Sequence, residues 1–210
     1  MEEPKLNWYA LKVFYSKVFD MEDRLLGIPV DDVYIPVRRV PLKGAEYGRI
    51  KKRLATPDDR RRLRVPLFAY VQEGPLIYKR ECIVPSLLFV RCTPDQINSI
   101  FSSIINKEFP SAMIYRNAER DGFATVSERD IKMFRMVVGS DDKGLTFYSG
   151  DSIEGFRVGE KVRVLYGPLK GVEGYIKRIK RDRRLLVSIE GFVAVATSFI
   201  PPEFLEVVQE

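Results

Sequence analysis

The last third of the chain constrains the fold most, because it combines short strand-like stretches with no helical period. Apolar and polar residues alternate in short segments that glycines or charged turns separate. Five short strands within about 55 residues are typical of a small β-barrel. The expected strands cover residues 161–165, 174–180, 185–189, 192–196 and 204–207.

The turn between the first two of these strands has the most informative spacing, within residues 156–176. Its glycines suit a chain that reverses direction within few residues, because glycine tolerates positive φ and close backbone approach. Valines alternate with cations in the strand before it, which places apolar residues inside. This pattern resembles the KOW motif of small SH3-like barrels in NusG and in some ribosomal proteins. The motif comprises Val162, Val164, Gly167, Pro168, Gly171, Gly174 and Ile176.

The first 138 residues have a different pattern, in which strands and helices alternate. Residues 7–14 and 33–40 read as strands, and apolar spacing predicts a helix from Val18 to about Gly27, with Ser16 as its cap. The pattern continues with a hairpin at 65–82, a buried strand at 83–92 and a helix capped by Asp95. A strand at 112–115 and a helix from Ser127 to about Val138 complete it. The order β-α-β-β-α-β is that of a split βαβ, ferredoxin-like domain.

The expected fold class is therefore α+β with two domains. Residues 1–138 form the ferredoxin-like domain, and a basic excursion at about 41–80 interrupts its sheet. Residues 139–155 are rich in Gly, Ser and Asp and predict a linker, and residues 156–210 form the barrel.

The first domain is also similar to the N-terminal domain of the NusG family. Trp8-Tyr9-Ala10-Leu11 matches the opening strand of that family, and Tyr34-Ile35-Pro36 matches its second strand. Residues 84–90 occupy the place of the family's Phe-Pro-Gly-Tyr-Val strand, although Val84, Ser86 and Leu87 depart from it. The longer, more basic excursion and this diluted signature are most like the specialised antiterminators of the UpxY type.

The resemblance implies a non-enzymatic transcription elongation factor. In the family, a hydrophobic depression on the first domain binds the clamp helices of RNA polymerase, and the KOW domain is a site for termination factor Rho or a ribosomal protein. The matching polymerase-binding positions are Trp8, Tyr9, Leu11, Pro85, Leu87 and Phe89. We expect Tyr9 and Pro85 to be exposed, whereas Trp8, Leu11 and Phe89 could equally be sheet core.

The basic charge is concentrated in two segments, although the whole chain carries only +6. Residues 43–64 hold nine Lys and Arg against three acidic residues, and residues 156–184 hold ten against three. Such clustering favours a polyanion partner, because neutralised phosphates release counterions. In the excursion we expect contact with DNA or nascent RNA through Tyr47, Arg49, Lys51, Lys52, Arg53, Arg60, Arg61, Arg62 and Arg64. In the barrel, six cations form a basic hairpin, which binds RNA, a protein or only solvent. These cations are Lys177, Arg178, Lys180, Arg181, Arg183 and Arg184.

Several other classes of function fit the sequence poorly. Histidine is absent, which removes His-based catalysis, and Cys82 and Cys92 lack the paired spacing of a zinc site and read as buried free thiols. A metal-dependent nuclease would have to use Asp20, Glu22 and Asp23, or Asp141 and Asp142, without supporting ligands. We therefore expect no cofactor, no metal and no enzymatic activity.

The expected setting is a cytoplasmic monomer that does not bind membranes, because no stretch approaches the roughly 18 apolar residues of a membrane span. The main alternative is a KOW-containing RNA-binding or ribosome-associated protein, which leaves the Trp-Tyr domain unexplained. The sequence does not indicate whether the protein promotes termination or prevents it.

Overall fold

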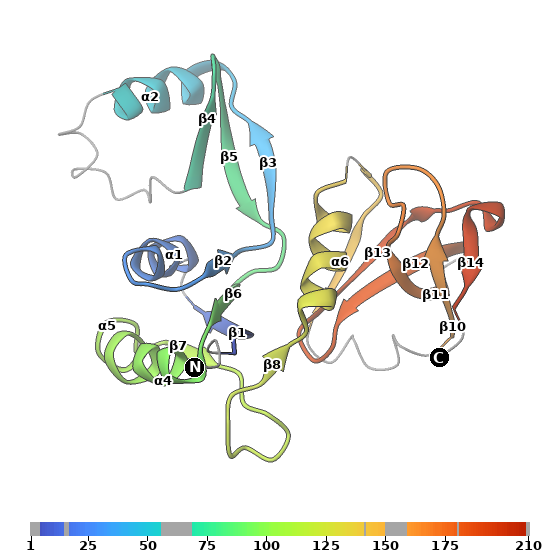
Figure 1. Ribbon diagram of the computed structural model, residues 1–210. Coiled ribbons are helices and arrows are strands. Elements are labelled where there is room, and N and C mark those ends of the chain that lie inside the picture. The colour runs from blue at the N-terminus through green and yellow to red at the C-terminus, as the bar shows by residue number, and fades with distance from the viewer. Residues whose placement is uncertain are drawn as a thin grey trace. The chain divides into compact units, whose positions relative to one another are not determined.

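The computed structural model describes residues 5–14, 17–55, 69–140, 142–149, 159–179 and 181–208. The chain divides into two compact units, Met1–Tyr115 and Arg116–Glu210 (Figure 1). The fold is α+β with several antiparallel sheets and few helices, as predicted. Within the described ranges, no helix is both long and apolar enough to cross a membrane.

The first unit is built on an antiparallel sheet of strand order β2-β6-β1-β7. The two strands at its centre, β1 and β6, come from distant parts of the chain and consist largely of buried apolar residues. The strands are β1 (Asn7–Val13), β2 (Asp32–Tyr34), β6 (Leu87–Cys92) and β7 (Ala112–Ile114).

Two helical segments accompany this sheet. Helix α1 (Val18–Leu26) ends at Gly27 as predicted, whereas Ser16 lies outside the described residues and Lys17 is the residue that precedes the first turn. The second segment runs through α4 (Pro94–Ser99), the π-helical η2 (Ile100–Ile105) and α5 (Asn106–Glu108).

The cap of α4 is Thr93, not Asp95 as the sequence suggested. The Thr93 hydroxyl accepts a hydrogen bond from the Gln96 amide at 3.2 Å, and the Gln96 side chain accepts one from the Thr93 amide at 2.9 Å. This reciprocal capping box satisfies two amides, and Pro94 fits the first helical position, where its missing N–H costs nothing.

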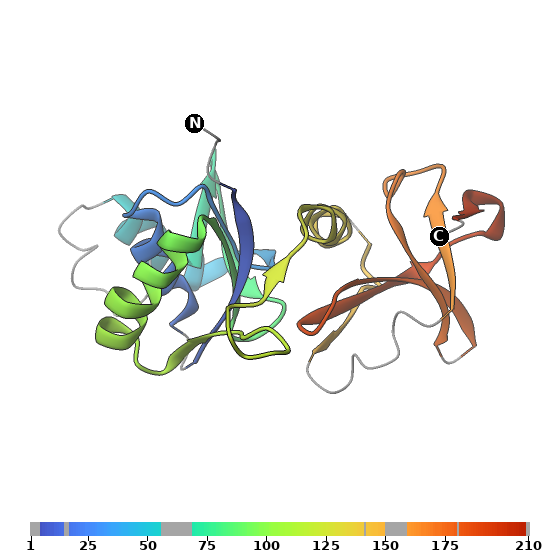
Figure 2. The same cartoon turned by 60° about the horizontal axis from the view of Figure 1, so that its bottom comes forward.

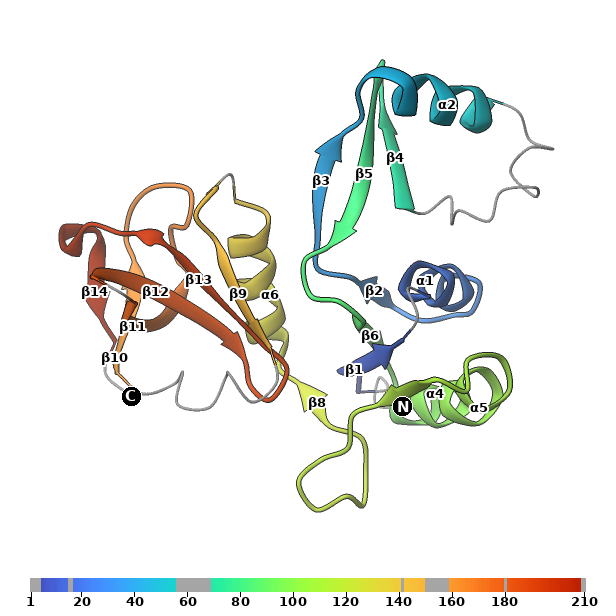
Figure 3. The ribbon, with the colours of Figure 1, turned by 180° about the vertical axis from the view of Figure 1, so that it is seen from behind.

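The excursion forms a small sheet of its own, which the sequence did not predict. The predicted strand 33–40 is divided at Ile35-Pro36, so that β2 stays in the first sheet and β3 (Val37–Pro41) enters a second sheet of order β3-β5-β4. The predicted hairpin is confirmed as β4 (Tyr70–Glu73) and β5 (Leu76–Cys82), which turn at Gly74 with a φ of 56°. Helix α2 (Gly44–Ala55) lies at the end of this sheet where β4 and β5 turn (Figure 3).

The second unit contains β8 (Thr125–Val126), helix α6 (Glu128–Val138) and a strongly curved six-stranded antiparallel sheet (Figure 2). Its strand order is β14-β10-β11-β12-β13-β9, and α6 packs against β12 and β13. The strands are β9 (Thr146–Ser149), β10 (Glu160–Val164), β11 (Glu173–Ile179), β12 (Asp182–Ile189), β13 (Val193–Phe199) and β14 (Leu205–Val207); the short 3₁₀ helix η4 covers Pro202–Phe204.

The structure differs from the predicted domain boundaries in two respects. Helix α6, capped by Ser127 as expected, belongs to the second unit rather than to residues 1–138. Strand β9 lies within the predicted linker 139–155 and pairs with β13. Asp142 fixes this segment, because its carboxylate accepts hydrogen bonds from the Gly144 amide at 2.8 Å and the Ser198 amide at 2.7 Å.

The two cysteines are free thiols. Cys92 is buried as expected, and burial raises the pKa of its thiol to about 12. Cys82 is only half-buried, and loss of solvation raises its pKa as well. Both thiols are therefore poor nucleophiles at neutral pH.

Candidate functional site

The candidate polymerase-binding residues lie on two opposite faces of the first sheet. Residues that pair across antiparallel strands share a face, and successive residues alternate between faces. Phe89 pairs with Ala10, which places it on the face of Trp8, and Leu87 lies two residues away on that same face. Tyr9 pairs with Val90 and lies on the other face.

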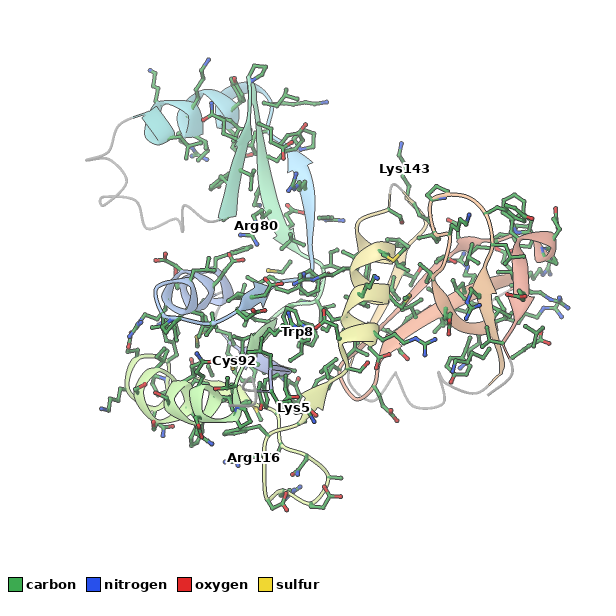
Figure 4. The ribbon with its side chains drawn as sticks, in the orientation of Figure 1. Lys5, Trp8, Arg80, Cys92, Arg116 and Lys143 are labelled. Carbon is green, nitrogen blue, oxygen red and sulfur yellow. The ribbon has the colours of Figure 1, made fainter. Side chains whose placement is uncertain are left out.

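The second face is the one that the helices cover. In Figure 4 the labelled Cys92 lies on the side of α1 and α4, and the labelled Trp8 lies on the opposite side of the sheet. Cys92 pairs with Asn7, so Tyr9 and Leu11 share its face. The predicted set thus separates into Trp8, Leu87 and Phe89 on one face and Tyr9 and Leu11 on the helix-covered face.

As a set, the six candidate polymerase-binding residues are more buried than the sequence analysis predicted. Pro85 is exposed, as predicted, whereas Tyr9 retains 3% of its accessible surface and the prediction of an exposed Tyr9 is wrong. Loss of solvation raises the pKa of the Tyr9 hydroxyl, whose oxygen lies 3.5 Å from the side-chain nitrogen of Asn7. Trp8, Leu11, Leu87 and Phe89 are buried too.

Sequence reasoning missed one aromatic member of the Trp8 face. Tyr34 on β2 pairs with Phe89, and the two rings stack with centroids 6.1 Å apart and planes inclined by 19°. The sequence contained a signal for this residue, because Tyr34 belongs to Tyr34-Ile35-Pro36, the segment similar to the second strand of the NusG family. The face formed by Trp8, Tyr34, Leu87 and Phe89 therefore spans three adjacent strands.

The turn before β6 has an unusual backbone. Ser86 adopts a φ of 68°, and its carbonyl accepts a hydrogen bond of 2.7 Å from the Val13 amide. Left-handed backbone is costly for a residue with a side chain. Ser86 stands where the quoted family signature has glycine, so the strained conformation gives a physical reason for glycine at that place.

The basic excursion presents its cations from α2. Arg49, Lys51 and Lys52 are exposed on this helix. Tyr47 is half-buried: its hydroxyl donates to the Pro75 carbonyl at 2.7 Å, and the Lys51 ammonium lies 5.6 Å from its ring centre. Tyr47 thus braces the helix against the hairpin and is poorly placed to stack on a base. The side chain of Arg53 and the whole of Arg60, Arg61, Arg62 and Arg64 lie outside the described residues.

Cations on the small sheet itself are paired with carboxylates. Arg38 donates to Glu81 at 2.8 Å, and Arg39 pairs with Glu73. Hydrogen bonds from Arg38, and then from Lys79, lower the pKa of Glu81. The α2 cations Arg49, Lys51 and Lys52 are exposed to solvent, whereas Arg38 and Arg39 on the sheet are held by carboxylates.

The glycine-rich turn of the second unit has the geometry that its sequence predicts. Gly167 and Gly171 have φ values of 83° and 85°, and the Gly171 amide donates to the Val164 carbonyl at 2.8 Å. Gly174 is required by space, because a Cβ there would lie 2.2 Å from the Leu186 carbonyl oxygen. Val162 and Val164 are buried, Pro168 is exposed and Ile176 is half-buried.

The basic hairpin β11–β12 places like charges opposite one another. Lys177 pairs with Arg184, and Arg178 pairs with Arg183. Arg178 and Arg183 are exposed, as is Arg181 at the turn, whereas Lys180 lies outside the described residues. Like charges directly opposite in a sheet are destabilising, which favours an anionic partner there.

The carboxylates considered for a nuclease do not converge. Glu22 pairs with Arg80, Asp20 and Asp23 are exposed, and Asp141 lies outside the described residues. In the part of the chain that the structure describes, no three Cys, Asp or Glu side chains are grouped so that they could hold a metal ion.

Comparison with known proteins gives a match to solved structures and none to protein families or curated sequences. No protein-family model matches the chain, and no curated protein matches it. A solved structure described as "Domain interaction in Thermotoga maritima NusG" is similar over 98% of this chain and 98% of that chain, at 16% sequence identity and a TM-score of 0.44.

Proposed function

We propose that this chain is a NusG-type transcription elongation factor without enzymatic activity. Its first unit binds RNA polymerase and its effect is on pausing or termination, as in a specialised antiterminator. The observation that carries the proposal is that Trp8, Leu87 and Phe89, which match family positions on two strands distant in sequence, share one face of one sheet.

The strand order supports the same reading. In β2-β6-β1-β7 the first and third strands of the β-α-β-β-α-β series are central, which is the arrangement of a split βαβ domain. The turn glycines of the second unit likewise have conformations that suit a KOW motif. Each feature alone is common among folds, but their order along one chain is specific.

The Trp8 face has the chemistry of a surface that binds a helix. Trp8, Phe89 and Leu87 supply two large aromatic rings and a leucine, and such anchors contribute most of the affinity where a helix lies in a groove. All three side chains are buried in this structure, so this face has to become accessible before a helix binds it. Clamp helices of the polymerase are partners of this kind. The exposed Pro85, in the turn that precedes Leu87 and Phe89, would lie at the rim of the interface.

The α2 cations would then contact nucleic acid in the elongation complex. Arg49, Lys51 and Lys52 share one exposed helix, and contacts of this type position a protein on phosphates without reading sequence. Rho or a ribosomal protein remains the proposed partner of the second unit. The rival proposal is an RNA-binding or ribosome-associated protein, which the like-charge pairs of the β11–β12 hairpin favour.

Two measurements test the proposal. Affinity for purified RNA polymerase, set against affinity for ribosomes, separates the two functions, and we expect polymerase to be bound. Pro85→Asp, which adds charge at the rim, should weaken polymerase binding about tenfold. The matched control is Leu76→Asp on the excursion, since Leu76 is also an exposed apolar residue.

Transcription in vitro across a Rho-dependent terminator measures whether the protein promotes termination or prevents it. Increased readthrough supports the specialised antiterminator, and increased termination supports a general elongation factor. Binding to ribosomes without binding to polymerase would overturn the proposal.

A further inference from the structure

The excursion is joined to the first sheet through a narrow neck of two chain crossings (Figure 3). One crossing runs from β2 to β3 through Ile35-Pro36, and the other runs from β5 to β6 through residues 83–86. The two lie side by side, because the Ile83 amide donates to the Pro36 carbonyl at 2.9 Å. Two-stranded ribbons vary more in twist than wider sheets do. The orientation of the excursion against the first sheet therefore depends on contacts outside the neck.

One such contact is the ion pair between Arg80 on β5 and Glu22 on α1. The Arg80 guanidinium donates two hydrogen bonds to the Glu22 carboxylate and lies over the ring of Phe19, which is also on α1. Figure 4 shows the labelled Arg80 between the small sheet and α1. Two hydrogen bonds between a planar guanidinium and a carboxylate accept one mutual geometry, whereas apolar surfaces can slide over each other. The pair therefore fixes a direction as well as a distance.

Helix α2 is held on the hairpin of the same small sheet. Besides the bond from Tyr47 to Pro75, the Leu42 amide donates to the Ile77 carbonyl at 2.8 Å, and Ile50 and Ile77 are both buried. The hairpin turn lies about 20 Å from Arg80 along the strand, at about 3.3 Å per residue. A rotation about the neck would thus displace the cations of α2 by much more than it displaces Arg80.

We propose that Glu22 and Arg80 are positioning residues, which hold the exposed cations of α2 at one fixed place relative to the Trp8 face of the first sheet. This role rests on the proposed function, because it matters only where polymerase and nucleic acid are bound together. Two contacts on one rigid body reinforce each other, since the first contact presents the second at a high effective concentration. On a body that pivots this advantage falls, although each contact by itself is as strong as before.

A purely structural role of the pair leads to a different expectation. A structural role predicts that loss of Glu22 weakens every binding activity together, in step with loss of folded protein. A positioning role predicts unchanged affinity for polymerase alone and for DNA alone, and a loss only for an elongation complex that offers both. Selection of one geometry is also the better-attested use of a buried ion pair, because apolar residues of the same size often stabilise a protein equally well.

Distance measurements test the orientation directly. Spin labels are attached at Glu46→Cys on α2 and Asn98→Cys on α4, both exposed positions, and double electron–electron resonance measures their separation in the full chain. The native thiols have raised pKa values and react slowly at neutral pH, so the introduced cysteines are labelled first. We expect one narrow distribution of distances in the parent chain and a broad one in Glu22→Ala, because the excursion then pivots about its neck.

Two further variants separate orientation from folding. Glu108→Ala removes a bidentate pair with Arg24, which joins α1 to α5 and does not involve the excursion, so its distance distribution should stay narrow. Glu22→Gln keeps the size of the side chain and loses its charge, so it tests the pair without leaving a cavity. Its distribution should broaden in the same way as that of Glu22→Ala. Circular dichroism establishes that each variant is folded.

Binding is measured against RNA polymerase alone, a DNA duplex alone and an elongation complex assembled from polymerase, DNA and RNA. Glu22→Ala should weaken binding to the elongation complex about tenfold and leave the other two affinities unchanged. Removal of the α2 cations, by Arg49→Gln, Lys51→Gln and Lys52→Gln, should weaken binding to the elongation complex in the parent chain. The same removal should have much less effect in Glu22→Ala, because two coupled contacts do not contribute additively.

Three results would count against the positioning role. Narrow distance distributions in both Glu22 variants would show that the pair does not set the orientation. Unchanged affinity for the elongation complex, in a variant that still binds polymerase, would overturn this role alone. Equal losses for polymerase alone and for the elongation complex would assign the pair a structural role instead. A parent chain that binds no polymerase would overturn the proposed function and this role together.

Discussion

Arg80 on β5 donates two hydrogen bonds to the carboxylate of Glu22 on α1, at 2.6 and 2.8 Å. The pair is largely buried, with 16% and 8% of the two side chains exposed, and the guanidinium lies 4.9 Å from the ring centre of Phe19. It ties the sheet of the excursion to the helix that covers the first sheet. Two chain segments 58 residues apart are thereby fixed to each other.

The first prediction concerns this pair. Glu22→Ala should lower the free energy of unfolding by about 3 kcal/mol, because it leaves a buried guanidinium without its counter-charge. Urea denaturation measures the change. Glu108→Ala is the control, because Glu108 makes similar bonds with Arg24 at an exposed position, where the effect should be much smaller. Equal losses in both variants would contradict the importance of burial.

The second prediction concerns the left-handed turn before β6. Ser86→Gly should stabilise the protein by roughly 0.5 kcal/mol, since relief of about 1–2 kcal/mol of backbone strain exceeds the added entropy of the unfolded chain. Ser86→Val should destabilise it, because a β-branched residue tolerates the φ of 68° poorly. A stabilising valine at this position would exclude strain as the explanation.

The sequence predicted those elements of the fold that local residue patterns determine, and it missed those that depend on pairing between distant segments. Helix α1, the β4–β5 hairpin and the KOW-like turn follow from local apolar spacing and glycine placement, and all three were predicted. The separate sheet of the excursion was missed because β3 pairs with β5 about 40 residues later, and no local period shows this.

The candidate site was predictable to a similar degree. The sequence placed Trp8, Tyr9, Leu87 and Phe89 on strands, but it did not give the register of β1 against β6, and register decides which face each residue occupies. Tyr9 was misassigned for a different reason: its face is the one that the helices cover (Figure 4), and the local pattern does not show which face that is. The segment 139–155 looked like a linker because Gly, Ser and Asp are typical of loops, and the bonds of Asp142 that support β9 are contacts with Ser198, far away in the sequence.

The third prediction compares two glycines. Gly174→Ala should destabilise the second unit, because the new methyl group would lie 2.2 Å from the Leu186 carbonyl oxygen, a backbone atom that moves only with its strand. Gly48→Ala should instead stabilise the protein by about 0.5–1 kcal/mol, since Gly48 lies within α2 with open space around it. Hydrogen exchange in β11 and β12 would locate the first effect, and thermal melting would measure the second. If hydrogen exchange in β11 and β12 were unchanged in Gly174→Ala, the two strands could make room for a methyl group without loss of stability, and the prediction would be wrong.

The fourth prediction concerns pH and the carboxylate that holds β9. Burial raises the pKa of Asp142, but hydrogen bonds from the Ser198 side chain and amide and from the Gly144 amide outweigh it, so that the net pKa is lowered. A folded-state pKa below the unfolded one means that the stabilisation is present above the ordinary Asp range and is lost as pH falls through the folded value. Hydrogen exchange of β9 and β13 should therefore increase on acidification below about pH 4. Asp142→Asn should show faster exchange already at neutral pH and less dependence on pH, whereas Glu119→Gln, at an exposed position of the same unit, should behave like the parent chain. If acid left β9 as well protected as at neutral pH, the bonds of Asp142 would not be what fixes this strand to β13.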